Sequence, residues 1–376
     1  MLTSEEAAAR LGIKVSTLYV YVSRGLLQSH RAGDGRRSLF DVEDVERMAR
    51  RSRGGRSVES RMAVVATALT ELRADGPAYR GRSAVELAAS ATPEQVADLL
   101  WGVDAAPWEM APLAAPPLLA PRDRLPWTVV MVGASDPLRS DLRPAAVVRA
   151  ARTLISTLAT RPGVELPAGA PLALRLATSC TPAPTPEVVD AVRTAMVLLA
   201  DHELATSTLA VRVAASTRAD VYDALLSGLG TLAGPLHGSA STLVLDLLTR
   251  AGADGAGAAL DESLRWHRFV PGFGHGAYPQ GDPRCDALLG AVLTLADDER
   301  RDTIEQLVGL AAAAELPAPN VDLALGALAY CADMPAEVLP MLFAVARCPG
   351  WVAHYLEELD ETPLRFRARA VHVTSR

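Results

Sequence analysis

Three of the seven histidines stand in short glycine-rich or acidic contexts that leave an imidazole ring accessible. His202 lies in Asp-His-Glu, His237 in Gly-Pro-Leu-His-Gly and His275 in Gly-Phe-Gly-His-Gly. An accessible imidazole can donate a hydrogen bond to a developing oxyanion or exchange a proton with a substrate. Each histidine alone is a weak signal, because a single histidine is more often structural. Neither a His-Glu-x-x-His motif nor cysteines at ligand spacing accompany them, so the sequence predicts no metal site.

Further short motifs occur along the chain in a fixed order. The series comprises Tyr-Arg-Gly at 79–81, Asp-His-Glu-Leu at 201–204, Gly-Pro-Leu-His-Gly at 234–238, Gly-Phe-Gly-His to Asp-Pro-Arg at 272–284, Asn-Val-Asp at 320–322, Arg-x-x-Gly-Trp-x-Ala-His at 347–354 and Arg-Ala-Arg-Ala-Val-His at 367–372. This series resembles the citrate synthase family. The resemblance spans about residues 58–372, and separate motifs in the family's order make chance agreement very improbable.

The resemblance implies an enzyme that condenses acetyl-CoA with oxaloacetate to give citrate and CoA. Such an enzyme is an acyltransferase that converts the acyl group into an alkyl group on transfer, as in the tricarboxylic acid cycle. It implies Asp322 as the base, His237 as the hydrogen-bond donor to the thioester oxygen, and His275 as the group that polarises the oxaloacetate carbonyl. No cofactor is expected beyond the acyl-CoA co-substrate.

Oxaloacetate is a dianion, and planar guanidinium groups suit carboxylates. The resemblance assigns its carboxylates to Arg284, Arg347 and Arg367, together with His202. It also implies a homodimer in which each site takes one arginine from the neighbouring subunit, and Arg367 is the candidate. The family's proline after this arginine is replaced here by Ala368.

Several positions depart from the family pattern. Gly-Ala-Tyr-Pro at 276–279 stands where the family often has Arg-Val-Tyr-Lys, so two basic side chains that could meet CoA phosphates are absent. Leu199 stands where many members have a histidine, Ala205 where asparagine is frequent, and 323–325 reads Leu-Ala-Leu. We expect these changes to reshape the pocket. They leave propionyl-CoA as an alternative acyl donor, which would make the protein a 2-methylcitrate synthase, and they leave a different 2-oxo acid open.

The N-terminal 56 residues differ in charge from the rest of the chain. They carry 11 basic and 7 acidic side chains, a net charge of +4, whereas the remaining residues carry −11. Capping and glycine signals predict helix, turn, helix, wing and helix at 5–10, 12–15, 17–24, 26–39 and 41–51. This pattern resembles the winged helix-turn-helix of MerR and excisionase proteins. The resemblance implies DNA contacts from the second helix and the wing, with the candidates Lys14, Ser16, Thr17, Tyr19, Arg36 and Arg37.

The expected fold is mainly α: a citrate synthase-like two-domain helical fold preceded by a small winged helix-turn-helix domain. Aromatic residues make up only 5% of the chain, while alanine and leucine, which favour helices, dominate. Residues 71–102 are expected to form a turn and two capped helices, and the prolines between 101 and 144 predict an irregular segment. Apolar residues spaced by three and four predict helices at 143–158, 186–204, 207–229, 239–251, 282–297, 299–315, 321–331, 336–347 and 350–359. The helix-turn-helix domain would occupy 1–56, the large domain 57–234 and 331–376, and the small domain 235–330.

Two other functions stay open beside the enzyme. The chain could be a DNA-binding regulator whose synthase-like body senses a carboxylate or an acyl-CoA, or its basic N-terminal domain could serve only folding or dimerisation. Four well-separated cysteines without a Cys-x-x-Cys pair favour a reducing compartment. The N-terminus lacks signal-peptide features, and no run of eighteen apolar residues occurs. We therefore expect a cytoplasmic protein without a membrane partner.

Overall fold

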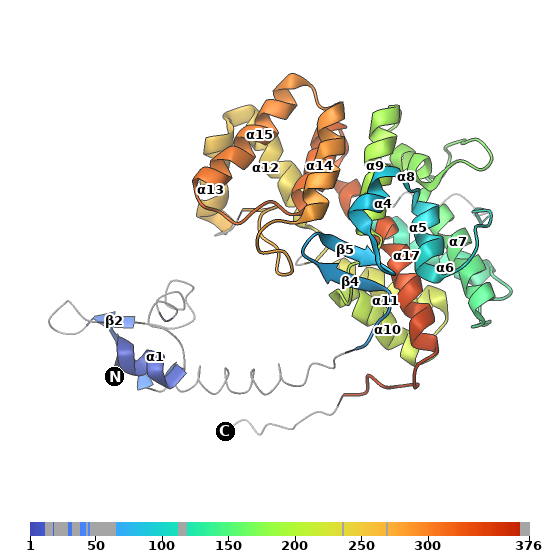
Figure 1. The fold of residues 1–376 in the computed structure, drawn as a ribbon, viewed down its shortest axis with the longest axis horizontal. Helices are drawn as coiled ribbons and strands as arrows, with labels where there is room; N and C mark the ends of the chain where they lie inside the picture. The colour runs from blue at the N-terminus through green and yellow to red at the C-terminus, as the bar shows by residue number, and fades with distance from the viewer. Residues whose placement is uncertain are drawn as a thin grey trace. The chain divides into compact units, whose positions relative to one another are not determined.

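The computed structural model describes residues 1–11, 18, 29–31, 38–42, 44–45, 65–111, 119–234, 237–267 and 270–368. It divides into two compact units, Met1–Ala66 and Thr67–Arg376, which are described separately below (Figure 1). The predicted DNA contacts Lys14, Ser16, Thr17, Tyr19, Arg36 and Arg37 lie outside the described residues.

The first unit begins with the predicted capping box. The Thr3 amide donates to Glu6 Oε2 at 2.9 Å, and the Glu6 amide donates to Thr3 Oγ1 at 3.3 Å. These bonds satisfy two amide groups at the start of α1, Ser4–Leu11. A small antiparallel sheet in the order β1, β3, β2 accompanies the helix, with strands Leu2–Thr3, Ser38–Phe40 and Ser29–Arg31. Strands β2 and β3 fall within the segment predicted to form the wing and at its end.

The second unit is mainly helical, as predicted. Its helices are α4 Ala84–Ser90, α5 Pro93–Trp101, α6 Pro121–Ser135, α7 Pro144–Ala159, α8 Leu172–Cys180, α9 Pro186–Leu199, α10 Thr206–Ser216, α11 Val221–Leu232, α12 Ala240–Asp254, α13 Ala256–His267, α14 Pro283–Leu295, α15 Asp298–Ala313, α16 Val321–Cys331 and α17 Leu339–Leu359. A short sheet precedes them, with strands β4 Thr70–Arg73, β5 Gly76–Tyr79 and β6 Arg82–Ser83.

The helices of the second unit form two groups (Figure 1). Helices α12, α13 and α15 pack together, and α12, α14 and α15 pack on α16, whereas α5, α7, α9, α10 and α11 pack around α17. The first group falls within residues 235–330, the segment predicted to form a small domain. That division into large and small domains stays a prediction.

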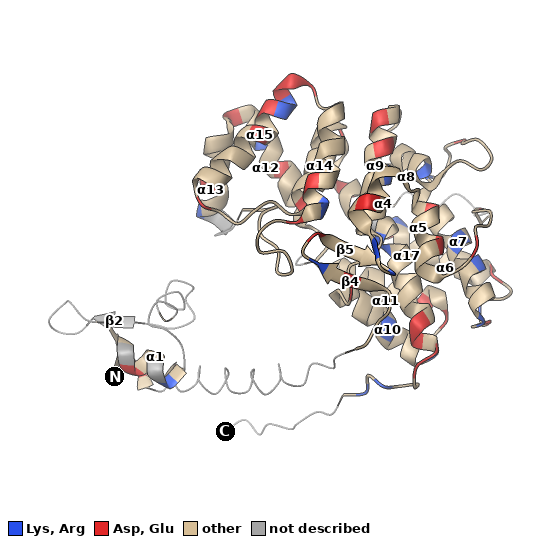
Figure 2. Ribbon diagram, in the orientation of Figure 1, with Lys and Arg blue, Asp and Glu red and all other residues tan. Residues whose placement is uncertain are grey.

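Acidic side chains open several of these helices, and Figure 2 shows them at the starts of α9 and α15. Asp297 caps α15 by accepting from the Arg300 amide, and Asp298 and Glu299 lie in its first turn. Negative charge at a helix N-terminus is stabilising because it interacts favourably with the positive end of the helix dipole. Acidic residues of the second unit therefore stabilise the N-termini of these helices.

Several helix ends differ from the sequence prediction. The predicted helices 336–347 and 350–359 are one helix, α17, with Pro349 inside it. Pro349 cannot donate a hydrogen bond, but its carbonyl accepts from Trp101 Nε1 at 2.9 Å, and tertiary packing keeps the helix continuous. Conversely, the predicted helix 207–229 is two helices, because Asp220 caps α11 through the Asp223 amide.

Other elements were missed by the sequence analysis. The hairpin β4–β5 replaces an expected turn, and α8 and α13 were not predicted. Helix α6 crosses a proline-rich stretch predicted to be irregular and contains Pro126. Its residues Leu125, Val129 and Val132 are buried, so packing against the core stabilises the helix despite the proline.

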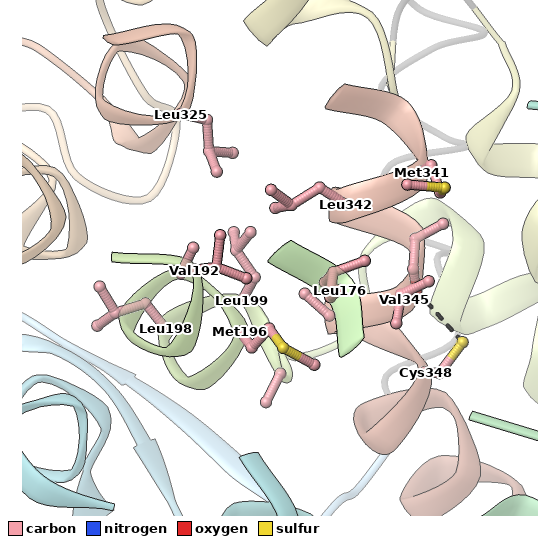
Figure 3. Close-up of a cluster of buried hydrophobic side chains, with 14 of the residues drawn as sticks. Leu176, Val192, Met196, Leu198, Leu199, Leu325, Met341, Leu342, Val345 and Cys348 are labelled. Atoms are coloured by element: carbon pink, nitrogen blue, oxygen red, sulfur yellow. Dashed lines mark hydrogen bonds between the residues drawn. The ribbon is translucent and has the colours of Figure 1, made fainter. Parts of the chain in front are cut away.

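Apolar side chains from distant segments form the core beside α17. Figure 3 shows Leu176 of α8, Leu199 of α9, Leu325 of α16 and Leu342 of α17 in one cluster. Leu199 and Leu325 are 0% and 1% exposed and pack in the core. The expectation that these two departures reshape the pocket stays a prediction.

All four cysteines are buried and free. Burial raises the pKa of the Cys180, Cys285 and Cys348 thiols to about 12, and that of Cys331 to about 11. Helix Ala336–Leu359 is long and apolar enough to cross a membrane, but 78% of its most apolar window is buried within the protein. It is the central helix of the second unit.

One face of α17 fixes the segment that ends α9. Arg347 Nε donates to the Leu199 carbonyl at 2.6 Å, and the Gly350 amide donates to the Ala200 carbonyl at 3.0 Å. His354 Nε2 lies 3.1 Å from Asp201 Oδ2. Residues 347, 350 and 354 share a helix face because they are three and four residues apart. Helix α17 therefore determines the position of His202, which directly follows Asp201.

Replacing Gly350 with alanine should destabilise the protein. A Cβ atom there would collide with the Ala200 carbonyl oxygen and with Asp201, so the packed backbones must separate. We expect a loss of about 1–3 kcal/mol in the free energy of unfolding, measured by urea denaturation. Gly309→Ala is the matched control, because a Cβ at that exposed position in α15 meets no atom within 4 Å. It should raise stability by up to about 1 kcal/mol, and equal effects at the two sites would contradict this account.

Candidate active site

The predicted site residues come from different elements of the second unit. His202 follows α9, His237 follows α11 and His275 precedes α14, while Arg284, Asp322 and Arg347 lie on α14, α16 and α17. The His202 and His275 rings meet edge to face, with centroids 5.2 Å apart. Arg284 and Arg347 both act electrostatically on His202 and on Asp322, and Arg347 acts on His237. The structure thus brings these six residues together.

The loop that carries His275 is docked on the segment preceding α16. Gly272 and Gly274 have φ angles of +84° and +82°, which glycine adopts without strain. The Gly274 amide donates to the Ala318 carbonyl at 2.7 Å, and Asn320 Nδ2 donates to the Gly274 carbonyl at 2.7 Å. Asn320 also caps α16, where its Oδ1 accepts from the Asp322 amide at 2.9 Å. One asparagine therefore joins the loop of His275 to the helix turn of Asp322.

The hydrogen bonds of His275 determine which nitrogen carries its proton. The Ala277 amide donates to His275 Nδ1 at 3.2 Å, so in the neutral ring the proton resides on Nε2. Burial and the nearby Arg284 lower the pKa of His275, which favours this neutral form. Arg284 Nη2 lies 3.4 Å from Nε2. Two donor groups that face each other in this way are suited to share an acceptor such as a substrate oxygen.

Arg284 is held by a buried carboxylate. Its Nε and Nη2 donate to the two oxygens of Asp282 at 2.9 and 2.8 Å, and its exposed fraction is only 2%. Although burial alone would raise the pKa of Asp282, its bonds to Arg284 and to the Val321 amide hold that pKa below its usual range. Asp282 uses two of the five guanidinium donors, so the others remain for a ligand.

Arg347 has no such carboxylate. Within the described residues it forms no ion pair; its Nε bonds to the Leu199 carbonyl, and its guanidinium lies 5.1 Å from the centroid of the Phe343 ring. Burial lowers the pKa of Arg347. Burial, Arg284 and Arg347 also lower the pKa of His202 far below its usual range, so this ring is neutral. The site thus combines buried positive charge with neutral imidazoles, which favours an anionic ligand.

His237 is oriented by a serine. Its Nε2 lies 2.8 Å from Ser207 Oγ, near the start of α10, and its ring meets Phe343 edge to face. Burial, followed by the charge of Arg347, lowers the pKa of His237. A neutral imidazole fixed by a hydroxyl at one nitrogen can direct its other nitrogen at a substrate.

Asp322 is the one acidic group of the cluster with a strongly altered affinity for protons. Burial raises the pKa of Asp322 to about 6; Asp282 adds to this effect, whereas Arg284 and Arg347 oppose it. A carboxylate with a pKa near neutrality is a stronger base than an ordinary aspartate and is still ionised at neutral pH. It is suited to remove a proton from a weak carbon acid.

Comparisons with known proteins agree with this site. The family described as "Citrate synthase, C-terminal domain" matches residues 142–369, and that described as "Helix-turn-helix domain" matches residues 1–53. The chain belongs to the citrate synthase family. The matched segment of this family contains every member of the cluster, from His202 to Arg347.

Curated relatives match part of the chain. It is 37% identical over 186 residues to a citrate synthase of Mycolicibacterium smegmatis, covering 48% of this chain and 50% of that protein. It is 32% identical over 185 residues to 2-methylcitrate synthase 1 of Corynebacterium glutamicum, covering 45% and 46%. The chain therefore spans about half the length of the curated relatives it matches.

Solved citrate synthases share the fold. The enzyme from Thermotoga maritima superposes with a TM-score of 0.68 at 24% identity, over 84% of this chain and 94% of that one. The enzyme from Thermoplasma acidophilum, in a ternary complex with carboxymethyl coenzyme A and oxaloacetate, superposes with a TM-score of 0.66 at 22% identity. The match covers 84% of this chain and 95% of that one. The predicted fold class, a citrate synthase-like helical fold, is confirmed.

Arg367 is the predicted citrate synthase site residue that does not join the cluster of its own chain. It is exposed in the segment after α17, and its amide donates to the Leu364 carbonyl. Its assignment stays a prediction, as do the roles of the other six residues. Within the described ranges no group of three His, Cys, Asp or Glu side chains could hold a metal ion.

The sequence analysis missed groups that support the citrate synthase-like site. Arg212 Nη1 donates to His354 Nδ1 at 3.0 Å, which leaves the proton on Nε2 to donate to Asp201. Arg212 also pairs with the fully buried Glu358 at 2.9 Å. This buried network supports the residue before His202. Ser207 was missed as well, although its position five residues after His202 in the same segment is a signal that could have indicated it.

The raised pKa of Asp322 should make its contribution to stability depend on pH. Because the folded protein holds the Asp322 proton more tightly than the unfolded chain, the ionised carboxylate destabilises the fold as pH rises from about 4 through 6. Asp322→Asn should therefore gain stability relative to the wild type, by about 2 kcal/mol more at pH 8 than at pH 4. Urea denaturation at both pH values measures this. Asp302→Asn controls for the loss of one exposed carboxylate, and a pH-independent difference for Asp322→Asn would contradict the assignment.

Proposed function

We propose that the protein condenses an acyl-CoA with oxaloacetate, releasing CoA, with acetyl-CoA as donor and citrate as product. The observation that carries the proposal is the combination of a basic Asp322 with two neutral imidazoles and two buried arginines in one cluster. Membership of the citrate synthase family supports it.

Each group has a distinct role in the proposed reaction. Asp322 takes a proton from the acyl methyl carbon, and His237 donates a hydrogen bond to the thioester oxygen, which becomes the enolate oxygen. The enolate carbon attacks the ketone carbon of oxaloacetate, and the ketone oxygen takes the proton from His275 Nε2. The proton that Asp322 removed from the acyl carbon is returned to His275, so both groups end in their starting protonation states. Water then hydrolyses the citryl-CoA thioester to citrate and the CoA thiol.

The two carboxylates of oxaloacetate are assigned to Arg284, Arg347 and His202 of one subunit and to Arg367 of a homodimer partner. The exposed position of Arg367 after α17 is consistent with a role outside its own site. The departures from the family pattern at Leu199 and Leu325 leave the choice between acetyl-CoA and propionyl-CoA open. A 2-methylcitrate synthase using propionyl-CoA is therefore the alternative within this proposal, and a similar relative carries that name.

CoA release measures the proposed reaction directly. Purified protein is mixed with oxaloacetate and either acetyl-CoA or propionyl-CoA, and the free thiol is followed with a thiol reagent. We expect release that falls about 10²–10⁴-fold in His275→Ala and Asp322→Asn, because each removes one acid–base or hydrogen-bonding group. Asp302→Asn, an exposed acid on α15, is the matched control and should keep full activity.

The relative rates with the two acyl donors identify the substrate. Absence of CoA release with both donors, at high protein concentration, would contradict the enzymatic proposal.

A second function is favoured by a separate observation. Residues 1–53 match a helix-turn-helix domain, and the first 56 residues carry a net charge of +4 on an otherwise acidic chain. We propose that this domain binds DNA through Lys14, Ser16, Thr17 and Tyr19, with Arg36 and Arg37 on phosphates. The synthase-like unit would then sense a carboxylate or an acyl-CoA, whether or not it also turns over.

DNA affinity should depend on salt through the two arginines. For the full-length protein and a library of labelled duplexes, fluorescence anisotropy at several salt concentrations should give a steep dependence of the Kd. Arg36→Ala combined with Arg37→Ala should lower the slope of log K against log salt by about 2, because two phosphate contacts are lost. Weak binding without salt dependence would instead favour a domain that serves folding or dimerisation.

A further inference from the structure

Tyr278 follows His275 in the same loop and is almost completely buried. The Tyr278 amide donates to the His275 carbonyl at 3.2 Å, and the Gly281 amide donates to the Tyr278 carbonyl at 3.2 Å. Two successive turns therefore fix the tyrosine relative to the histidine. Its exposed fraction is 4%, although loop residues Gly276, Ala277 and Pro279 around it are exposed.

The Tyr278 ring forms part of the cluster of the candidate site. It stacks on His275 with centroids 5.2 Å apart and an interplanar angle of 28°, and it meets His202 edge to face at 5.8 Å. The Arg284 guanidinium carbon lies 5.7 Å from its centroid. Three of the groups assigned to oxaloacetate thus contact this one ring, which restrains the plane of His275.

The hydroxyl of Tyr278 has no hydrogen-bond partner among the described residues, although it is buried. His202 Nε2, on a ring that touches Tyr278, is also buried and unpartnered. A buried polar atom without a partner is uncommon and costs stability, so it calls for a physical explanation. Two such atoms on touching rings beside Arg284 are explained by a ligand whose polar atoms pair with them.

Charge around the hydroxyl determines what that ligand can be. Burial raises the pKa of Tyr278 to about 12; Asp282, Asp75 and Glu203 contribute to this, and Arg284 opposes it. The phenol therefore stays protonated and can donate. Neither Asp75 nor Glu203 accepts a hydrogen bond from it in the structure. A donor beside Arg284 and a neutral His202 is suited to a carboxylate oxygen.

We propose that Tyr278 is a substrate-binding residue: its hydroxyl donates to a carboxylate of the 2-oxo dicarboxylate, and its ring holds His275 in position. The inference rests on the proposed function, because it takes oxaloacetate as the ligand. It extends that function by assigning the substrate's carboxylate a neutral donor in addition to the arginines.

Binding of oxaloacetate alone, measured by isothermal titration calorimetry on the full chain, tests the hydroxyl. Tyr278→Phe keeps the ring and removes only the donor, so the Kd should rise about tenfold or more. The thermal midpoint of the free protein should stay equal or increase, because an unpaired buried hydroxyl is lost. Tyr330→Phe, at the far end of α16 from Asp322, is the matched control and should leave the Kd unchanged.

An unchanged Kd for Tyr278→Phe would overturn the proposal. A lower thermal midpoint with an unchanged Kd would show that the hydroxyl serves the fold, for instance through Asp75 or Glu203. If the wild type binds oxaloacetate and only the Tyr278 effect is missing, this inference fails while the proposed function stands. If the wild type does not bind oxaloacetate, the proposed substrate fails and this inference with it.

Measurements of kcat and KM distinguish the role of the Tyr278 ring from that of its hydroxyl. Tyr278→Ala removes the surface on which His275 stacks, so kcat should fall at least tenfold with both acyl donors. Tyr278→Phe should restore kcat while keeping the raised KM for oxaloacetate. An equal loss of kcat in both variants would overturn the assignment of the ring as a positioning group.

Discussion

The close approach of α17 to the end of α9 is the constraint on which the rest of the site depends. Arg347, Gly350 and His354 lie on one face of α17 and contact residues 199 to 201 in succession. Only glycine at position 350 lets the backbones come so near. The same contact places the Arg347 guanidinium in the site and fixes the segment that leads to His202. It also joins Asp201 to the buried network of His354 and Arg212. Pro349 is tolerated because the helix is held by these contacts in addition to its own hydrogen bonds.

Burial and uncompensated positive charge together set the protonation states of the site. Burying a guanidinium is costly unless an anion accompanies it. Asp282 accompanies Arg284, but no described carboxylate pairs with Arg347. Burial, followed by this excess charge, lowers the pKa values of His202 and His237, and the charge partly offsets the effect of burial on Asp322. The imidazoles are thereby kept as neutral donors, and a dianionic ligand would supply the missing negative charge.

The sequence predicted the helical class and the six residues of the cluster because each residue stands in a short motif whose spacing is local. It could not predict partners that lie far apart in the chain. The bond of Arg212 to His354 joins positions 142 residues apart, and no local pattern indicates it. The prediction of helix ends failed for a related reason. Asp220 caps α11 and so separates it from α10, whereas tertiary packing keeps α17 continuous through Pro349. Leu199 and Leu325 differ from the family pattern, but only the fold shows that they pack the core.

The buried cysteines have a practical consequence for spectroscopy. A thiol reacts as the thiolate, and thiols buried with pKa values of about 11 and 12 form almost none at neutral pH. Maleimide dyes and spin labels should therefore spare the native residues. Single cysteines introduced at exposed positions, one in each unit, would then carry a donor–acceptor pair on an otherwise unaltered chain. Distances measured between them would report how the basic N-terminal unit is placed relative to the acidic one, and how that placement responds to substrate.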